Sequence, residues 1–321
     1  MSSSSNKFQA ILQKYIKKFD DDNKHSETHD AVIDGVKYFI KVVGKTKKEH
    51  MKNEIKSLRD LADIFPMYHN YFVDSAEDKD HCAILLRYIE GEDLKCLLDK
   101  KCSKSMVICL YRMLFTKLQM FHDQRITHGD VKPQNFYSYI DPKDGMVKLK
   151  LIDTETCTFH KTIQKVDDIK RLRSLYYYLP DNPRSSTFFK NKEEAFIFFR
   201  YLDHYSLACF MLYLLKPDVY KMLQSNGYKE DDKNPWRMSA KDLHSPYDYV
   251  DKEESELEKA LHYVFKYIPN EKTYRDDLPK FSEEKLAGFL FGDGTRKWNR
   301  ISIFRIFVII FVIIFKFYTY F

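Results

Sequence analysis

The chain has 321 residues, 44% of them hydrophobic, so it can bury one large core but has no room for a second large domain. Its 53 basic and 47 acidic residues are well mixed and give a net charge of +6, a pattern that does not favour binding to nucleic acid. The six cysteines show no C-x-x-C pair and no metal-binding spacing, which argues against a disulfide framework and indicates buried free thiols in a reducing compartment.

The first segment of the chain is polar. Residues 1–6 are rich in serine and lack an apolar core, so no secretory signal is expected there. A short helix is predicted over residues 8–19. The acidic stretch at 19–28 contains no glycine, which excludes a glycine-rich phosphate-binding loop in this region.

Strands and helices follow in a recognisable order. Residues 36–43 alternate between polar and apolar side chains, which predicts a strand, and a charged helix is predicted over residues 47–64. Residues 82–94 read as a buried strand that continues into a turn and a helix. An apolar periodicity over residues 106–124 predicts a further helix, which leads into a loop rich in chemically active side chains.

That loop, I-T-H-G-D-V-K-P-Q-N over residues 126–135, contains Asp130, Lys132 and Asn135, and the apolar strand L-K-L-I ends at Asp153. An aspartate can accept a proton from a hydroxyl group, and a lysine can steady a phosphoryl group during its transfer. The oxygen atoms of an asparagine and an aspartate are suitable ligands for Mg²⁺. The two segments therefore indicate chemistry on a nucleoside triphosphate with a divalent metal.

The same two segments resemble the catalytic loop and the metal-binding strand of the protein-kinase superfamily, whose pattern is H-R-D-x-x-x-x-N followed by D-F-G. The resemblance implies that Asp130 is the catalytic base and that Asn135 and Asp153 are the ligands of Mg²⁺. It also implies that Lys132 neutralises charge on the transferred group. The Lys132–Pro133 pair is typical of Ser/Thr kinases.

The upstream strand and helix also resemble the family. By this resemblance Lys41 is the lysine that contacts the α- and β-phosphates of ATP. Glu54, thirteen residues later on the predicted helix, is the expected ion-pair partner of Lys41, and Glu49 is the alternative. Ordinary surface charges at these positions are the competing interpretation.

The strand over residues 82–87 resembles the start of the kinase hinge, where backbone groups bind adenine. The resemblance implies that Leu86 guards the back of the nucleotide pocket and that Tyr88 lies in the hinge. Asp93 is expected either to reach the ribose hydroxyls or to cap the helix that follows it.

The downstream match is less specific. Residues 203–215 resemble the central buried helix of the large kinase lobe, and the opening residue, Asp203, is expected to brace the backbone of the catalytic loop. Asp168 is the competing match. Arg275 is expected to be either a late structural arginine of the family or a solvated charge.

The chain departs from the family pattern at several places, three of which bear on nucleotide binding and regulation. The glycine-rich loop is missing, which predicts weak nucleotide affinity. The D-F-G position reads Asp153-Thr154-Glu155, so regulation by movement of the phenylalanine is not expected. Gly129 replaces the arginine before the catalytic aspartate, so activation by phosphorylation of the loop is not expected either.

We therefore expect an α+β fold, namely a bilobal protein-kinase-like fold with a C-terminal hydrophobic tail. Its parts are an N-terminal extension at 1–24, a small β-rich N-lobe at 25–88, a larger helical C-lobe at 89–290, a linker at 291–300 and the tail at 301–321.

The tail predicts a membrane anchor. Residues 306–315 carry no polar side-chain atom, and Arg305 and Lys316 flank them. If these two charges reach the lipid headgroups, the segment attains the roughly twenty residues that a spanning helix needs. This interpretation places the catalytic domain in the cytosol, anchored by its tail to an intracellular membrane. A core strand or helix packed on the large lobe is the alternative.

The function implied by the resemblance is transfer of the γ-phosphoryl group of ATP to Ser or Thr hydroxyls of a protein substrate, with Mg²⁺ as cofactor. Two alternatives stay open: a pseudokinase that serves as a scaffold with little transfer activity, and a kinase that acts on a small molecule. Retention of Asp130 together with Asp153 favours a working enzyme, because a scaffold has no chemical need for both.

Overall fold

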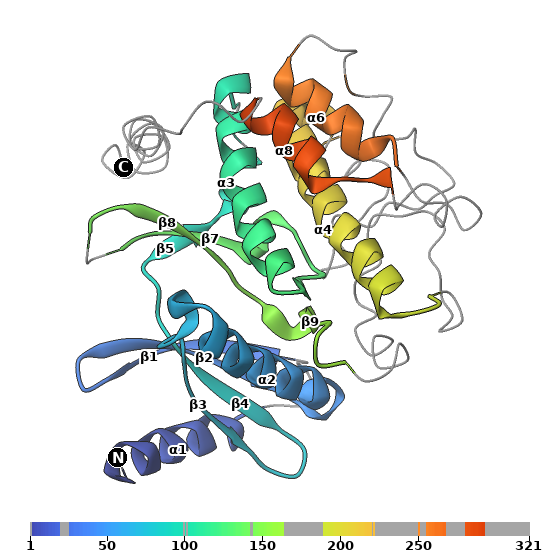
Figure 1. Ribbon diagram of the computed structural model, residues 1–321. Coiled ribbons are helices and arrows are strands. Elements are labelled where there is room, and N and C mark those ends of the chain that lie inside the picture. The colour runs from blue at the N-terminus through green and yellow to red at the C-terminus, as the bar shows by residue number, and fades with distance from the viewer. Residues whose placement is uncertain are drawn as a thin grey trace, which may run out of the picture. The chain divides into compact units, whose positions relative to one another are not determined.

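A computed structural model describes residues 2–19, 26–98, 102–141, 144–163, 189–219, 255–267 and 280–292, together with residues 100, 221 and 250. The chain divides into two compact units, which are described one at a time with the labels of Figure 1. The first unit comprises residues 1–91 and 152–156, and the second comprises residues 92–151 and 157–321.

A four-stranded antiparallel sheet with the strand order β1-β2-β4-β3 forms the centre of the first unit. Strands β1 and β2 are joined by a two-residue turn in which Asp34 and Gly35 have φ angles of 53° and 75°. Positive φ at both positions matches the twist of a hairpin and suits glycine. The strands are β1 (Ser26–Ile33), β2 (Val36–Val43), β3 (Phe72–Glu77) and β4 (Cys82–Arg87).

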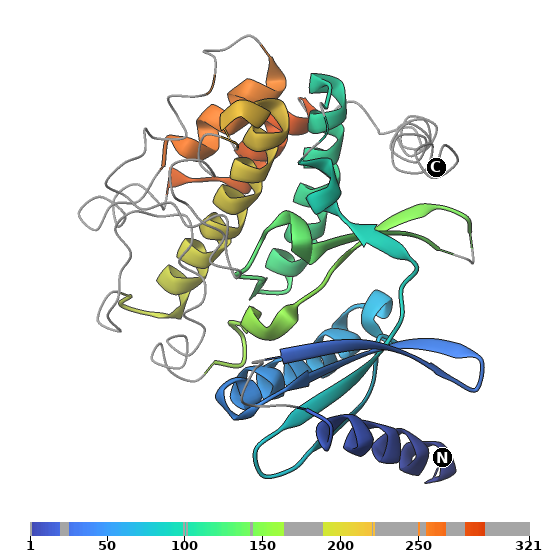
Figure 2. The ribbon, with the colours of Figure 1, turned by 180° about the vertical axis from the view of Figure 1, so that it is seen from behind.

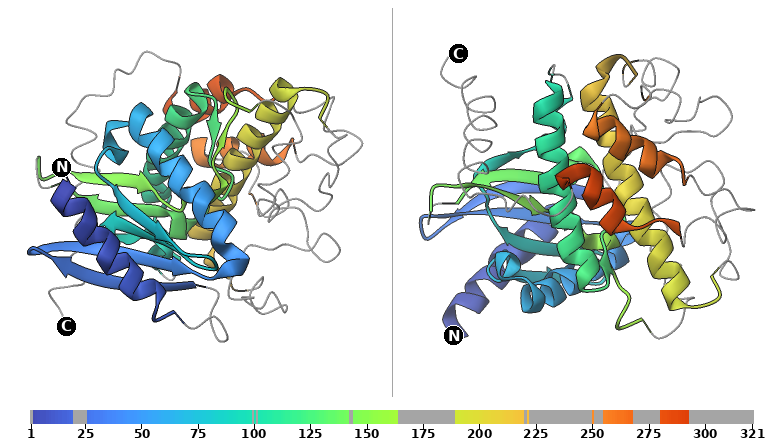
Figure 3. Two further views of the ribbon diagram at one scale, coloured as in Figure 1. Left: turned by 90° about the horizontal axis from the view of Figure 1, so that it is seen from below. Right: turned by 45° about the horizontal axis from the view of Figure 1, so that its top comes forward.

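Two helices, α1 (Ser2–Ile16) and α2 (Lys48–Ile64), cover opposite faces of this sheet (Figures 1 and 3). Leu12 of α1 is fully buried and packs in one cluster with Ile40 and Leu85 of the sheet. The first unit therefore has an apolar layer on both faces, which agrees with the almost continuous burial of β4. Helix α1 begins earlier than the predicted residue 8, because no glycine or proline interrupts the polar residues before it.

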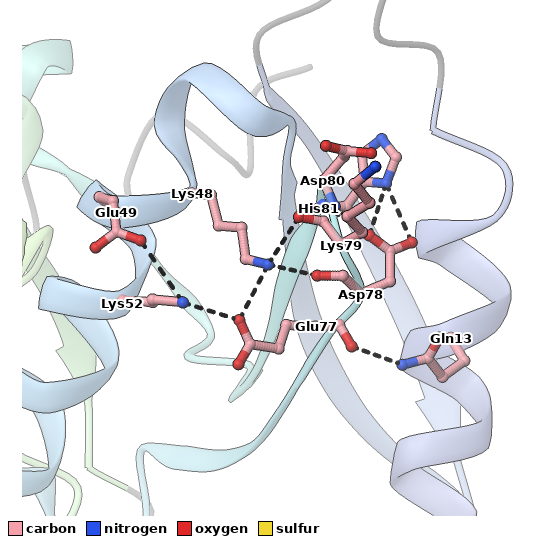
Figure 4. A network of polar contacts seen from close by, with 9 residues as sticks. All are labelled: Gln13, Lys48, Glu49, Lys52, Glu77, Asp78, Lys79, Asp80 and His81. Carbon is pink, nitrogen blue, oxygen red and sulfur yellow. Dashed lines mark hydrogen bonds and ion pairs between the residues drawn. The ribbon is translucent and has the colours of Figure 1, made fainter.

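Polar contacts join α1, α2 and the turn between β3 and β4 (Figure 4). The carboxylate of Glu77 lies 3.2 Å from the amino groups of both Lys48 and Lys52. Gln13 of α1 donates a hydrogen bond of 3.4 Å to the carbonyl of Glu77, and Lys48 donates to the carbonyl of Asp78. The first turns of α2 and helix α1 thus both contact the end of β3.

The second unit is mainly helical, as Figure 2 and Figure 3 show. Within the described residues of this unit, each of the four α-helices begins after a Ser or Asn whose side chain accepts a hydrogen bond from a backbone N–H of the first turn. Such a cap stabilises a helix by about 1 kcal/mol. Apolar faces of α3 and α4 pack on each other, and α8 packs on α6 and α3. The helices are α3 (Lys104–Asp123), α4 (Lys192–Leu215), α6 (Glu256–Phe265) and α8 (Glu283–Phe291).

Short strands of the second unit hold the segment that carries the predicted catalytic loop. β6 (Ile126–Thr127) pairs with β9 (Thr158–Phe159), and β7 (Phe136–Ile140) lies between β5 (Gly91–Asp93) and β8 (Val147–Leu151). Residues 128–135 run from β6 to β7 and end in a short 3₁₀ helix, Pro133–Asn135. Both ends of the loop are therefore fixed by strand pairing.

The start of the central helix differs from the prediction. Helix α4 begins at Lys192, where Asn191 caps it by accepting a hydrogen bond of 2.9 Å from the N–H of Glu194. Asp203 therefore does not open the helix but lies in its middle, since the apolar residues that precede it are buried as well. The predicted start was too late because the family resemblance identified Asp203, whereas the helix begins after the capping residue Asn191.

Several predictions fall on residues outside the described part of the chain. They concern the acidic stretch at 20–25, Asp168, Arg275, most of the linker and the hydrophobic tail at 301–321. Within the described ranges, no helix has the length and apolar character needed to cross a membrane. The predicted anchor at 301–321 lies outside these ranges and stays a prediction.

Candidate active site

The buried carboxylate of Asp203 holds the backbone of the loop at 128–135. One carboxylate oxygen accepts a hydrogen bond of 2.8 Å from the N–H of His128, and the other accepts one of 2.8 Å from the N–H of Gly129. Gly129 has a φ of 79°, a conformation that residues with a Cβ adopt only with strain. Asp203 therefore braces this loop as the sequence predicted.

Asp130 follows directly and is fixed by two neighbours. The amino group of Lys132 lies 2.6 Å from Oδ2 of Asp130. The side-chain amide of Asn135 donates to the same oxygen at 3.0 Å and to the carbonyl of Asp130 at 2.8 Å. Oδ1 of Asp130 is buried and accepts no hydrogen bond from any residue that the structure describes. This oxygen is an available acceptor for the proton of a hydroxyl group.

Lys41 lies in the first unit, on β2, and its amino group is 2.7 Å from Glu54 of α2 and 3.7 Å from Asp153. Burial alone would lower the pKa of Lys41, but the attraction of the Glu54 and Asp153 carboxylates outweighs burial and raises it. The lysine is thus held in its charged form. Glu49, the alternative partner, is 82% exposed and lies 3.6 Å from Lys52 instead.

Glu155 joins the same cluster, although the sequence analysis did not select it. Carboxylate oxygens of Glu54, Asp153 and Glu155 all lie within 4.8 Å of one another. Burial raises the pKa of Glu54, and repulsion from the other two carboxylates adds to this rise against the attraction of Lys41. The signal in the sequence was the acidic residue in place of the last glycine of D-F-G.

A small cavity of about 210 Å³ in the first unit opens next to these charges and is lined by Lys41, Asp153 and Glu155 among others. Three carboxylates around one ammonium group leave an excess of negative charge, which favours a further cation.

Three predicted nucleotide-contacting residues lie outside these two clusters. Leu86 is buried in β4, and the backbone N–H of Tyr88 donates to the carbonyl of Lys37 at 3.3 Å. The carboxylate of Asp93 accepts a hydrogen bond of 2.8 Å from the N–H of Lys95 and caps a short 3₁₀ helix. The capping alternative is thus the one that the geometry shows for Asp93, and the contacts of all three residues with a nucleotide stay predictions.

Each unit offers an oxygen-bearing side chain of a kind that suits magnesium. Asp153 and Asn135 offer oxygen ligands, which Mg²⁺ prefers. The amide nitrogen of Asn135 is used in its bonds to Asp130, and its oxygen takes no part in them. In the first unit the structure brings together Lys41, Glu54 and Asp153, and in the second it brings together Asp130, Lys132 and Asn135.

Comparison with known proteins gives a consistent result. Residues 23–273 match the profile of the protein kinase domain. The chain is 27% identical over 154 residues to calcium/calmodulin-dependent serine/threonine-protein kinase 1 of Oryza sativa subsp. japonica, an alignment that covers 44% of this chain and 24% of that protein.

Two further relatives show similar identity. The probable casein kinase II subunit alpha homolog of Encephalitozoon cuniculi is 28% identical over 158 residues, covering 49% of this chain and 47% of the relative. Calcium/calmodulin-dependent protein kinase type 1 of Macrobrachium nipponense is 26% identical over 118 residues, covering 36% and 33%. The chain thus spans less than half of the length of each of these relatives.

Proposed function

Because this chain belongs to the protein kinase family, we propose that it is a Ser/Thr protein kinase that uses ATP and Mg²⁺. The observation that carries the proposal is the state of Asp130. Its backbone and one carboxylate oxygen are fixed by hydrogen bonds, while its buried Oδ1 accepts none from the described residues. An oriented acceptor of this kind suits a base that receives the proton of a hydroxyl group.

The roles proposed in the second unit concern the reacting groups. Asp130 orients the hydroxyl of a Ser or Thr and takes its proton at Oδ1. Lys132, whose amino group is 2.6 Å from the other oxygen of Asp130, neutralises charge on the group being transferred. The Lys132–Pro133 pair and the names of the relatives support Ser/Thr rather than a small molecule as the acceptor.

The roles proposed in the first unit concern the phosphates that are not transferred. Lys41 contacts these phosphates and is kept charged and oriented by Glu54 at 2.7 Å. Asp153 is proposed as an oxygen ligand for magnesium, and Asn135 in the second unit has the same proposed role. When bound, magnesium neutralises negative charge on the phosphate oxygens.

The test is phosphoryl transfer from labelled ATP to generic protein substrates in the presence of Mg²⁺. Asp130→Asn and Asp153→Asn are each expected to lower kcat by about 100-fold or more, because each removes a charge that acts on the reacting groups. Asp123→Asn is the matched control, since Asp123 is exposed and lies seven residues before Asp130. Near-normal transfer by either test variant would contradict its proposed role.

A scaffold without transfer activity is the second candidate, supported by the absence of glycine at 19–28. The two functions differ in a thermal-shift experiment combined with the assay. ATP with Mg²⁺ at 100 times its Kd should stabilise a working kinase by about 2.7 kcal/mol, and the absence of a shift would favour the scaffold. Stabilisation without transfer to protein or to cationic metabolites identifies the scaffold.

A further inference from the structure

A buried group of ionisable side chains lies at the start of α8. Oε1 of Glu283 is 2.6 Å from Nδ1 of His122 on α3 and 2.5 Å from Nε2 of His204 on α4. Its other oxygen lies 3.6 Å from the guanidinium of Arg200. Both histidine side chains are at most 1% exposed. One carboxylate therefore connects three helices of the second unit.

This group is continuous with the brace of the catalytic loop. The second ring nitrogen of His122 lies 3.0 Å from Oδ2 of Asp203. The same carboxylate accepts the hydrogen bonds from the N–H groups of His128 and Gly129. A path of direct hydrogen bonds thus runs from Glu283 through His122 and Asp203 to the residues just before Asp130.

The bonding pattern determines the charge of His122. Both of its ring nitrogens face carboxylates, so both must donate a proton, and this is possible only for the imidazolium form. Burial alone would lower the pKa of His122, but its hydrogen bonds to Asp203 and Glu283 raise it. Burial alone would raise the pKa of Glu283, but its bonds from His122 and His204 hold it below the usual range.

Two imidazoles and one carboxylate are also a set of zinc ligands. The geometry favours protons over a metal ion here for two reasons. The ligand atoms are already at hydrogen-bonding distances of 2.5 and 2.6 Å, and the guanidinium of Arg200 would repel a cation at Glu283.

We propose that Glu283 is a positioning residue for phosphoryl transfer, which acts through His122 and Asp203 to hold the backbone before Asp130 in place. The expected effect of Glu283 on the rate of transfer rests on the proposed function. The effect of Glu283 on the loop backbone does not depend on any activity. The ionisable or charged groups next to His122 or its two carboxylate partners are Asp203, Glu283, His204, His128, Arg200 and His160.

The experiment compares Glu283→Gln with Glu284→Gln. Both substitutions remove one negative charge from the first turn of α8, so their effects on the helix dipole are alike. Glu284, however, accepts a hydrogen bond only from the neighbouring Ser282 among the bonds described for it. Glu283→Gln is expected to lower kcat by about 10- to 100-fold with little change in KM for ATP, and Glu284→Gln to change neither.

The pH profile of kcat separates positioning from a merely structural role. Loss of the Glu283 charge lowers the pKa of His122, so kcat of Glu283→Gln should fall as the pH rises through this lowered value. Wild type and Glu284→Gln should lack this additional alkaline decline. A Glu283→Gln variant that loses only thermal stability, with unchanged kcat and pH profile, would overturn the proposal.

Hydrogen exchange of the amides at 128–130 gives a readout that does not need activity. Exchange should be faster in Glu283→Gln than in Glu284→Gln, and equal protection would also overturn the proposal. If wild type shows no transfer, the proposed function fails while this measurement still decides the role of Glu283. If Glu283→Gln does not fold, Glu283→Asp keeps the charge on a shorter side chain, and an unchanged kcat and unchanged exchange in it would reject the proposal.

Discussion

Two glutamates of α2 were candidates for the ion pair with Lys41, and the structure pairs Lys41 with Glu54 and not with Glu49. Glu54 is buried and 2.7 Å from Lys41, whereas Glu49 is 82% exposed and pairs with Lys52. The first pair orients a group proposed to contact phosphates, and the second is a surface pair of little energetic weight.

Glu54→Gln is therefore expected to raise KM for ATP by about tenfold, because Lys41 loses the partner that holds its amino group in place. Glu49→Gln is the matched control and should leave KM within about twofold of the wild-type value. Steady-state kinetics at varied ATP concentration measure both. Equal effects of the two substitutions would show that the buried pair has no role in nucleotide binding.

Contacts between residues close in the sequence could be predicted from their spacing. Contacts between residues far apart in the sequence could not. A lysine on a strand followed thirteen residues later by a glutamate on the next helix was enough to find the pair in the first unit. Glu283 lies 161 residues from its partner His122, so no local pattern in one sequence connects them. Tertiary packing of α8 on α3 decides that contact.

Helix α1 lies before the residues that match the kinase profile, but it contributes side chains to the apolar core of the first unit. It precedes residue 23, where the match to the kinase profile begins, yet Leu12 and Ile16 lie in the apolar cluster of the first unit. Leu12→Ala is expected to lower the free energy of unfolding by about 2 to 5 kcal/mol, since a fully buried leucine leaves a cavity.

Lys14→Ala provides the control for this prediction, because Lys14 lies on the same helix and is exposed. It should change the free energy of unfolding by no more than about 0.5 kcal/mol. Denaturant unfolding, followed by a signal from the first unit, measures both variants. A small effect of Leu12→Ala would mean that α1 does not belong to the folded core.

Element boundaries were predicted less well than element types. The strand at 36–43 is β2 with the same bounds, and the helix predicted at 47–64 is α2 (Lys48–Ile64). The start of α4 was missed by eleven residues, because the family resemblance marked Asp203 and not the polar first turn of the helix at Lys192–Glu194. The Asn191 cap was the local signal that marked the true start.

The stability of the whole molecule is expected to depend on pH through its buried histidines. His160 lies against Phe196, with ring centroids 5.1 Å apart, and burial lowers its pKa from 6.5 to about 3. As the pH falls below 6.5, the unfolded chain binds a proton that the folded chain does not. The free energy of unfolding therefore falls, by about 1.4 kcal/mol per pH unit at most for this group.

His204, whose pKa is lowered by burial, acts in the same direction. His122, whose pKa is raised, acts in the opposite one: its contribution is present below its ordinary value and is lost as the pH rises through the raised value. Two of these three buried histidines thus weaken the fold on acidification, and one opposes them.

The prediction is that His160→Gln removes part of the dependence of unfolding free energy on pH between about pH 5 and about pH 6.5. His69→Gln, at an exposed position, should keep the wild-type dependence. Urea titrations of the three proteins across this range provide the comparison. An unchanged slope in His160→Gln would mean that this histidine is charged in the folded state.

The first unit is assembled from two separate pieces of chain, residues 1–91 and the short segment 152–156 that contains Asp153. A gene split after codon 91 would give an N-terminal fragment without its acidic segment, and a C-terminal fragment that carries this segment detached from Lys41 and Glu54. Neither half would contain the complete charge cluster. Recovery of that cluster would then require reassociation of the halves, which makes this position a natural choice for a complementation reporter.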